Sequence, residues 1–269
     1  MNITLFDVES RKSMEKKKKL RTGIALVLTL VILTAGGYLG NMFGIFCEGN
    51  YKENTIKHAQ TVQDSPLRNK TVLFLGSSVT WGHASFGISF ADLLEKTDGI
   101  VAVKEAVSGT TLVDTGRSSY VSRLKTMDRT LPADVFVCQL STNDATKKMP
   151  LGAVSDSSDL CDFDTQTVAG AIEYIIAYVK DTWNCPVVFY TQAKYDSEEY
   201  AAMVQLLLQI REKWNISVLD LWNDAQFNDL TQDERKLYLA DAIHPTQAGY
   251  KDWWLPKFRD CLCGVLCEE

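Results

Sequence analysis

Short apolar runs alternate along the sequence with longer amphipathic stretches, and this alternation is the feature that most constrains the fold. The runs are rich in Val, Phe and Leu and cover residues 71–75, 101–107, 133–140, 186–191 and 217–221. Strands that are apolar at nearly every position need cover on both faces, which is typical of a parallel sheet between helices. The sequence therefore predicts an α/β domain over residues 70–269, with a five-stranded parallel sheet in three α/β/α layers.

Three amphipathic stretches between these runs predict the covering helices. They span residues 89–96, 165–182 and 197–214. The second is the clearest, and we expect Asp164 to cap its amino end. Its apolar residues repeat at helical spacing, namely Val168, Ile172, Ile175, Ile176 and Val179.

An uncharged run of 24 residues, 23–46, precedes the domain. As a helix it would reach about 36 Å at roughly 1.5 Å per residue, which exceeds a bilayer core of about 30 Å. A basic cluster at residues 16–21 precedes the run, so the positive-inside rule predicts a cytoplasmic basic tail over 1–22 and a domain outside the cell. A cleaved signal peptide is the alternative. We favour a retained single-pass anchor, because the run is long and ends in Phe46 and Cys47 rather than in a small-residue cleavage site.

The segment after the run, residues 47–69, mixes charged and polar residues without apolar periodicity. We expect it to be a stalk between the membrane and the domain, with His58 in the stalk. The chain carries 28 Lys and Arg against 34 Asp and Glu, and its basic excess is confined to the first 22 residues. A net acidic body makes nucleic acid an unsuitable partner.

Seven cysteines leave several alternatives open. Outside the cell the six cysteines after Cys47 could form disulfides, whereas Cys138 and Cys185, in or beside apolar runs, could equally be free buried thiols. The last three, Cys261, Cys263 and Cys267, lack a fourth metal ligand nearby, so we expect a disulfide staple there and neither a metal nor a cofactor.

Four polar segments follow strands of the predicted sheet. They are Gly76-Ser77-Ser78, Ser108-Gly109-Thr110, Ser141-Thr142-Asn143-Asp144 and Asp241-Ala242-Ile243-His244-Pro245. Because parallel strands end at the same edge of a sheet, we expect the four segments to meet there.

These segments, in this order, resemble the signature blocks of the SGNH hydrolase superfamily, also called GDSL esterases and lipases. The resemblance covers residues 71 to about 258 and implies a flavodoxin-like sheet and a serine esterase. Residue by residue, it implies a catalytic triad of Ser78, Asp241 and His244. It also implies an oxyanion hole formed by the N–H groups of Ser78 and Gly109 and the side chain of Asn143.

The residue types suit that chemistry on physical grounds. A serine hydroxyl attacks an ester at neutral pH only if an imidazole takes its proton, and a carboxylate fixes the tautomer of that imidazole. An amide such as that of Asn143 can stabilise the negative oxygen of the intermediate without adding charge. His83 has no such support, and we expect it at the surface, with a place at the edge of the site as the alternative.

Two residues depart from the family pattern. Ser77 replaces the usual aspartate of Gly-Asp-Ser, which we expect to change local hydrogen bonding, and Ser141 replaces a glycine, which we expect to add bulk near the oxyanion hole. The function expected is extracellular hydrolysis of O-acyl esters, with O-acetyl groups on glycans as the substrate. The alternatives are a lysophospholipase or short-acyl esterase, an acyltransferase of the same superfamily, and a catalytically silent glycan-binding domain.

Overall fold

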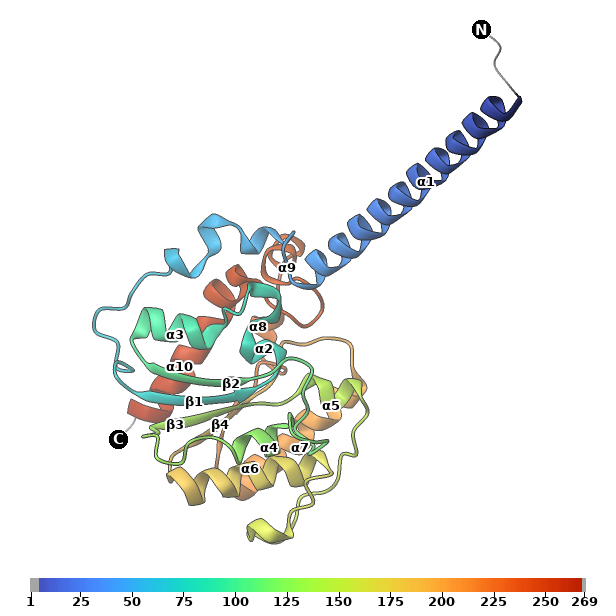
Figure 1. Ribbon diagram of the computed structural model, residues 1–269. Helices are drawn as coiled ribbons and strands as arrows, with labels where there is room; N and C mark the ends of the chain where they lie inside the picture. Colours follow the sequence, from blue (N-terminus) through green and yellow to red (C-terminus); the bar gives the residue numbers. More distant parts are fainter. Residues whose placement is uncertain (1–4, 268–269) are drawn as a thin grey trace.

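The computed structural model describes residues 5–267, and its domain is built on five parallel strands (Figure 1). The strands lie side by side in the order β2-β1-β3-β4-β5. All carboxyl ends therefore emerge at one edge of the sheet, as the alternating sequence predicts. The bounds are β1 Thr71–Gly76, β2 Val101–Ala106, β3 Val135–Gln139, β4 Val187–Tyr190 and β5 Ser217–Leu219.

Two long helices cover one face of the sheet: α3 (Phe90–Asp98) and α10 (Leu255–Cys267), the latter preceded by a π-helical stretch, Gly249–Trp254. An aromatic cluster joins these helices, because the rings of Phe90 and Phe258 stack with their centroids 3.7 Å apart. Phe74 of β1 packs into the same cluster.

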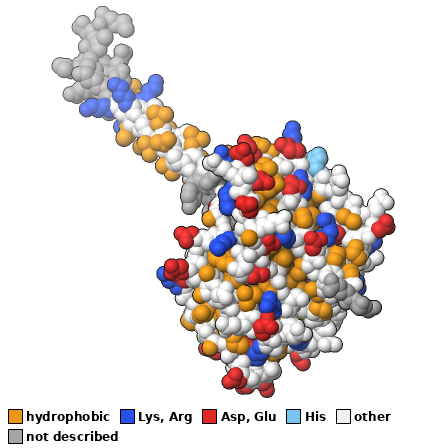
Figure 2. Space-filling view, turned by 180° about the vertical axis from the view of Figure 1, so that it is seen from behind, with side chains coloured by type: hydrophobic (Ala, Val, Ile, Leu, Met, Phe, Trp, Pro, Cys, Tyr) orange, Lys and Arg blue, Asp and Glu red, His pale blue; other side chains and the backbone are white. Residues whose placement is uncertain are grey.

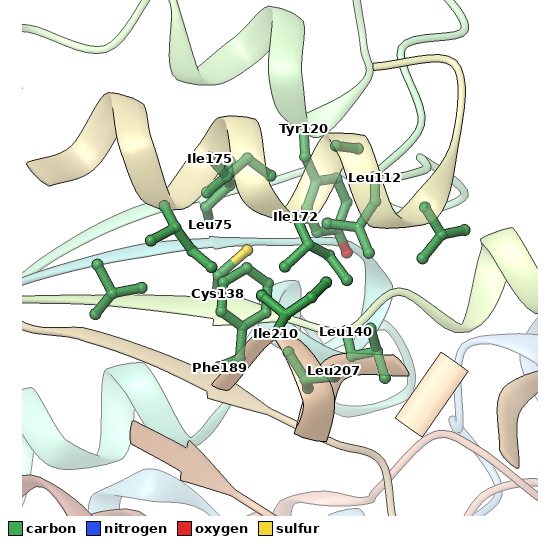
Figure 3. Packing of buried hydrophobic residues seen from close by; sticks show 14 of the residues in the cluster. Leu75, Leu112, Tyr120, Cys138, Leu140, Ile172, Ile175, Phe189, Leu207 and Ile210 are labelled. Carbon is green, nitrogen blue, oxygen red and sulfur yellow. The ribbon is translucent and has the colours of Figure 1, made fainter. Parts of the chain in front are cut away.

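The opposite face packs against α4 (Tyr120–Leu124), α6 (Val168–Trp183) and α7 (Glu198–Trp214). Figure 3 shows Ile172 and Ile175 of α6 near Cys138 and Phe189 of the sheet, with side chains of α7 alongside. These side chains are fully buried. The helices on both faces confirm the predicted three-layer arrangement.

Serine and threonine side chains cap the three predicted helices. Ser89 forms a capping box with Asp92 at the start of α3, and Ser197 accepts the N–H of Tyr200 at the start of α7. The predicted cap of α6 is wrong by three residues, because Thr167 accepts the N–H of Gly170 at that end. Asp164 instead accepts the N–H of Gln166, in the turn before the helix.

Short helices stand at the carboxyl edge of the sheet. Helix α2 (Ser78–Trp81) follows β1 and α5 (Thr142–Thr146) follows β3, while α8 (Ala225–Asn228) and α9 (Gln232–Tyr238) follow β5. The turns that lead into α2 and α5 are the first and third of the segments singled out in the sequence.

One long helix, α1 (Leu5–Met42), leads away from the domain (Figure 1). Its stretch from Lys16 to Gly37 is long and apolar enough to cross a membrane and is exposed throughout. The helix also includes most of the predicted basic tail, of which residues 1–4 lie outside the described residues. It ends before residues 43–46, the last four of the predicted span, which form a turn.

The segment expected to be a stalk is packed along the domain. It forms three single-turn 3-10 helices, Glu48–Asn50, Lys52–Asn54 and Ile56–His58. Leu67 is fully buried, and the hydroxyl of Ser65 donates to the carboxylate of Asp98 at 2.8 Å. These contacts join segments distant in sequence, so local polarity gave no sign of them.

The seven cysteines are all unpaired within the described residues. Cys138 and Cys185 are buried thiols, one of the two alternatives considered for them. The expected staple at the carboxyl end is not formed, because Cys261, Cys263 and Cys267 lie along α10 as free thiols. No group of three or more potential ligands among the described residues is placed to hold a metal ion.

Candidate functional site

Ser78 stands at the carboxyl end of the fully buried strand β1, as the first residue of α2. Gly76 precedes it at a point too crowded for any side chain, because a Cβ there would lie 1.7 Å from Oγ1 of Thr80. This close approach turns the chain sharply from strand into helix. As a result Ser78 lies at the sheet edge with only 6% of its surface exposed.

The hydroxyl of Ser78 contacts His244, although 166 residues separate them. Oγ of Ser78 lies 2.8 Å from Nε2 of His244, and Nδ1 of the same ring lies 2.7 Å from Oδ2 of Asp241. The three predicted side chains are thus connected by two short hydrogen bonds. The ring can pass a proton to or from the serine while the carboxylate fixes its tautomer.

The loop that carries His244 is shaped by its own hydrogen bonds. Oδ1 of Asp241 accepts the backbone N–H groups of Ile243 and His244 at 2.8 and 2.7 Å, and the His244 carbonyl accepts the N–H of Ala240. Burial favours a higher pKa for Asp241, but the hydrogen bonds and charge of His244 outweigh it and lower the pKa to about 2. The carboxylate therefore stays ionised across the physiological range.

Gly109 and Asn143 lie in adjacent loops, after β2 and β3. Gly109 has a φ of +80°, which favours glycine, and open space lies where a side chain would stand. Among the described residues no acceptor takes its N–H, which leaves this donor available to a ligand. Nδ2 of Asn143 donates to the carbonyl of Thr110 at 2.9 Å, which fixes the amide beside the glycine loop. Lys147 donates to the Gly109 carbonyl at 2.9 Å.

Asp144 joins the same two loops from below. Its buried carboxylate accepts the N–H groups of Leu112 and Val113 at 2.8 and 3.0 Å. Burial raises the pKa of Asp144, and those backbone bonds only partly oppose the change. This residue acts as a brace for the loops and not as a proton carrier at the serine.

Arg123 of α4 braces the site from the other side. Its buried guanidinium donates to the carbonyl of Gly76 at 2.8 Å and to Oγ1 of Thr110 at 3.2 Å. It also donates to the carbonyl of Glu105 at 2.9 Å. The guanidinium of Arg123 thus joins the ends of β1 and β2, where the loops that carry Ser78 and Gly109 begin.

The two departures from the family pattern both serve backbone structure. Ser77 is fully buried, and its N–H and hydroxyl donate to Oε1 of Gln139 at 2.9 and 3.3 Å. Ser141 is also fully buried; its Oγ accepts the N–H of Asn143 and donates to the Thr110 carbonyl at 3.3 Å. The side chain of Ser141, which we expected to add bulk near the oxyanion hole, instead caps the amino end of α5. Nothing in the sequence indicated that Gln139 would be the acceptor for Ser77, because a glutamine at the end of a strand belongs to no recognised motif.

His83 lies at the edge of the site, which is the alternative to the surface position that we favoured. Its ring centroid is 5.3 Å from that of His244, and its Nδ1 is 3.3 Å from Oγ of Ser108. Burial, followed by the nearby His244, lowers the pKa of His83. The only available signal was its position five residues after Ser78. Phe43, whose ring centroid is 5.0 Å from that of His83, gave no signal at all.

Comparison with known proteins agrees with the sequence blocks. The sequence model of the GDSL-like Lipase/Acylhydrolase family matches residues 74–251, which include Ser78, Gly109, Asn143, Asp241 and His244. A comparison with curated proteins finds no match. Among solved structures, a protein from Lactobacillus plantarum is 19% identical, with a TM-score of 0.62 over 73% of this chain and 98% of its own.

A second solved structure, a member of the lipolytic protein G-D-S-L family from Veillonella parvula, is 14% identical. It has a TM-score of 0.53 over 71% of this chain and 97% of its own. At such low identity the two structures establish a shared fold, whereas the family match covers most of the chain. The chain therefore belongs to the GDSL-like lipase/acylhydrolase family and is a serine ester hydrolase.

Proposed function

We propose that the chain is a membrane-anchored esterase that removes short O-acyl groups, with O-acetyl groups on cell-surface glycans as the expected substrate. The observation that carries the proposal is the pair of hydrogen bonds from Ser78 through His244 to Asp241, at 2.8 and 2.7 Å. A domain that only bound glycan would have no need of this arrangement.

In the proposed reaction, Nε2 of His244 takes the proton of the Ser78 hydroxyl as Oγ bonds to the acyl carbon. The carbonyl oxygen gains a negative charge, which the N–H groups of Ser78 and Gly109 and the amide of Asn143 would stabilise. His244 then gives its proton to the departing alcohol, leaving an acyl-enzyme. Water repeats the sequence, releasing the acid and restoring Ser78.

The space beside Gly109 would accommodate a small acyl group. Open space lies beside Gly109, where any larger residue would add a side chain, and Ser78 is only slightly exposed. The glycan part of the proposal depends on topology. If α1 is retained with its basic end in the cytoplasm, the domain faces the polymers of the cell surface.

The chemistry can be tested on the full chain in detergent with p-nitrophenyl acetate. Turnover should be lost in Ser78→Ala and in His244→Ala. Ser118→Ala and His58→Ala are matched controls, because both side chains are exposed and neither contacts the site. Equal rates in all variants would refute the mechanism. A folded protein that no fluorophosphonate labels at Ser78 would indicate the binding domain instead.

Topology is tested separately on intact cells. The exposed thiol of Cys161 lies in the domain, and an impermeant maleimide should label it if the domain faces outward. Labelling only after the cells are opened would place the domain in the cytoplasm.

A further inference from the structure

The end of α1 is fixed directly to the loops that carry the site. After Met42 the chain turns at Gly44, and the buried side chain of Asn50 secures this turn. Nδ2 of Asn50 donates to the carbonyls of Gly44 and Ala84 at 2.8 and 2.7 Å. Its Oδ1 accepts the N–H of Gln247 at 2.8 Å. One amide thus connects the end of α1 to the loop after Ser78 and to the loop after His244.

The distance between the end of α1 and the site is spanned by aromatic rings. The ring of Phe43 lies 5.0 Å from that of His83, and His83 lies 5.3 Å from His244, centroid to centroid. His244 in turn contacts Ser78. The ring of His83 alone therefore lies between Phe43, the first residue after α1, and the imidazole of His244.

The length of α1 fixes where this junction would lie relative to a bilayer. Between Arg21 and Met42 the helix rises about 32 Å at roughly 1.5 Å per residue, close to a hydrocarbon thickness of about 30 Å. Figure 2 shows blue basic side chains toward the far end of α1 and apolar ones along the part that leads to the domain. With the basic cluster at one surface, residues 43–46 emerge at the other.

Apolar side chains are exposed at this junction, where solvent alone would not favour them. They come from two segments, 43–46 and 81–86, and we refer to them as the rim: Phe43, Ile45, Phe46, Trp81 and Phe86. Their exposed fractions run from 37% for Trp81 to 60% for Phe46. Four are aromatic, the kind of side chain enriched where a bilayer meets water.

The loop that presents the second segment is held by hydrogen bonds. Lys104 donates to the carbonyls of Trp81 and Gly87 at 3.3 and 2.9 Å. Phe86 keeps a φ of +59°, a strained conformation for a residue with a side chain, while 53% of it is exposed. The fold thus holds an aromatic side chain outward beside the end of α1.

We propose that the rim is a membrane-contact surface that holds the mouth of the Ser78 site at the headgroup layer. The ester would then be carried by an amphiphile of that membrane surface, such as an acylated lipid-linked sugar. The inference rests on the proposed function and narrows its substrate class. A bilayer suits the rim better than a second protein, because the rim continues the apolar surface of the helix proposed to cross the membrane.

Contact is tested with the full chain in phosphatidylcholine vesicles that contain a doxyl-labelled phosphatidylcholine. Trp81 is the exposed tryptophan of the rim, and Trp222, Trp253 and Trp254 are buried in the domain. The nitroxide should quench a fraction of the emission in the natural protein that is missing in Trp81→Phe. Equal quenching of the two proteins, or recovery of the chain outside the vesicles, would overturn the proposal.

Substrate delivery is tested with two acetyl esters. One is soluble 4-methylumbelliferyl acetate, and the other is an umbelliferyl acetate with a hexadecyl chain, held in phosphatidylcholine vesicles. We compare the ratio of the two rates, vesicle ester over soluble ester. This ratio should fall about five-fold or more in the double variant Ile45→Ser and Phe46→Ser, because apolar area at the interface is lost. Val101→Ser is the matched control, since Val101 is 49% exposed at the opposite end of the sheet, where β2 begins.

The outcomes separate the two proposals. If neither ester is hydrolysed, the proposed function fails, while quenching of Trp81 still decides whether the rim touches the membrane. If both esters are hydrolysed but the ratio is unchanged in the rim variant, or falls equally in Val101→Ser, the membrane-contact surface is refuted and the esterase stands.

Discussion

Replacing Asn143 by alanine tests the proposed oxyanion hole most directly. The side-chain nitrogen carries two hydrogens, and one is donated to the Thr110 carbonyl at 2.9 Å, which orients the second. With that amide removed, two of three proposed donors remain, the N–H groups of Ser78 and Gly109. Loss of one donor raises such a barrier by about 3 to 4 kcal/mol, so kcat should fall about 100- to 1,000-fold. KM should change little, because the ester oxygen gains its charge only in the transition state.

The assay is kcat and KM of the full chain for p-nitrophenyl acetate, with urea unfolding of the same samples. Ser141→Ala is the matched control, because Ser141 caps α5 and shares the Thr110 carbonyl but leaves the amide in place. It should lower the free energy of unfolding by about 1 kcal/mol through the lost cap, with kcat nearly unchanged. The reasoning is refuted if Asn143→Ala keeps its kcat, or if the control loses as much.

Three further variants test charge and packing. Asp241→Asn should lower kcat for p-nitrophenyl acetate about 10⁴-fold, because the amide favours the wrong tautomer of the histidine. Since the pKa of Asp241 in the folded state is lowered to about 2, its contribution to stability is complete above about pH 4 and is lost as the pH falls toward 2. The urea midpoints of the natural protein and of Asp241→Asn should therefore converge over that pH range. A constant difference between the two midpoints would contradict the lowered pKa. Gly76→Ala should cost about 1 to 3 kcal/mol in urea unfolding, because its Cβ meets Thr80, whereas an unchanged midpoint would show that the turn can relax. Glu173→Ala should cost about 3 kcal/mol, since it removes the buried carboxylate that pairs with Lys213, and a loss below about 1 kcal/mol would show that the carbonyls of Ser155 and Ser157 suffice for Lys213.

The layers of the fold could be predicted because parallel strands carry their signal locally. Strand β1 is buried at all six positions, so its sequence has to be a continuous apolar run. Helix α6 is buried along one broad side, which requires apolar residues at helical spacing. The four polar segments could be grouped because parallel topology alone brings the carboxyl ends of strands together.

Features that depend on single long-range contacts could not be predicted. The amide of Asn50 binds partners 34 and 197 residues away, and nothing near Asn50 in the sequence marks it. The same amide binds the carbonyls of Gly44 and Ala84, the neighbours of Phe43 and His83, and so helps to bring these two rings together. The cap of α6 was misplaced because Asp164 and Thr167 are both good capping residues. Which one caps depends on the close approach of Gly170 to the backbone of Asp164.

The packing of residues 47–69 changes what an anchor would do for this enzyme. As a flexible stalk, these 23 residues would have a root-mean-square span of about 26 Å, and Ser78 could reach esters well away from the membrane. Packed as they are, they fix the rim beside the end of α1, and on the proposed topology the reach of Ser78 would be limited to about the headgroup layer. A site confined in this way needs little intrinsic affinity, because a substrate that shares the surface is already at high local concentration. On the proposed topology, discrimination between esters would then depend on where they are presented as much as on the shape of the acyl site.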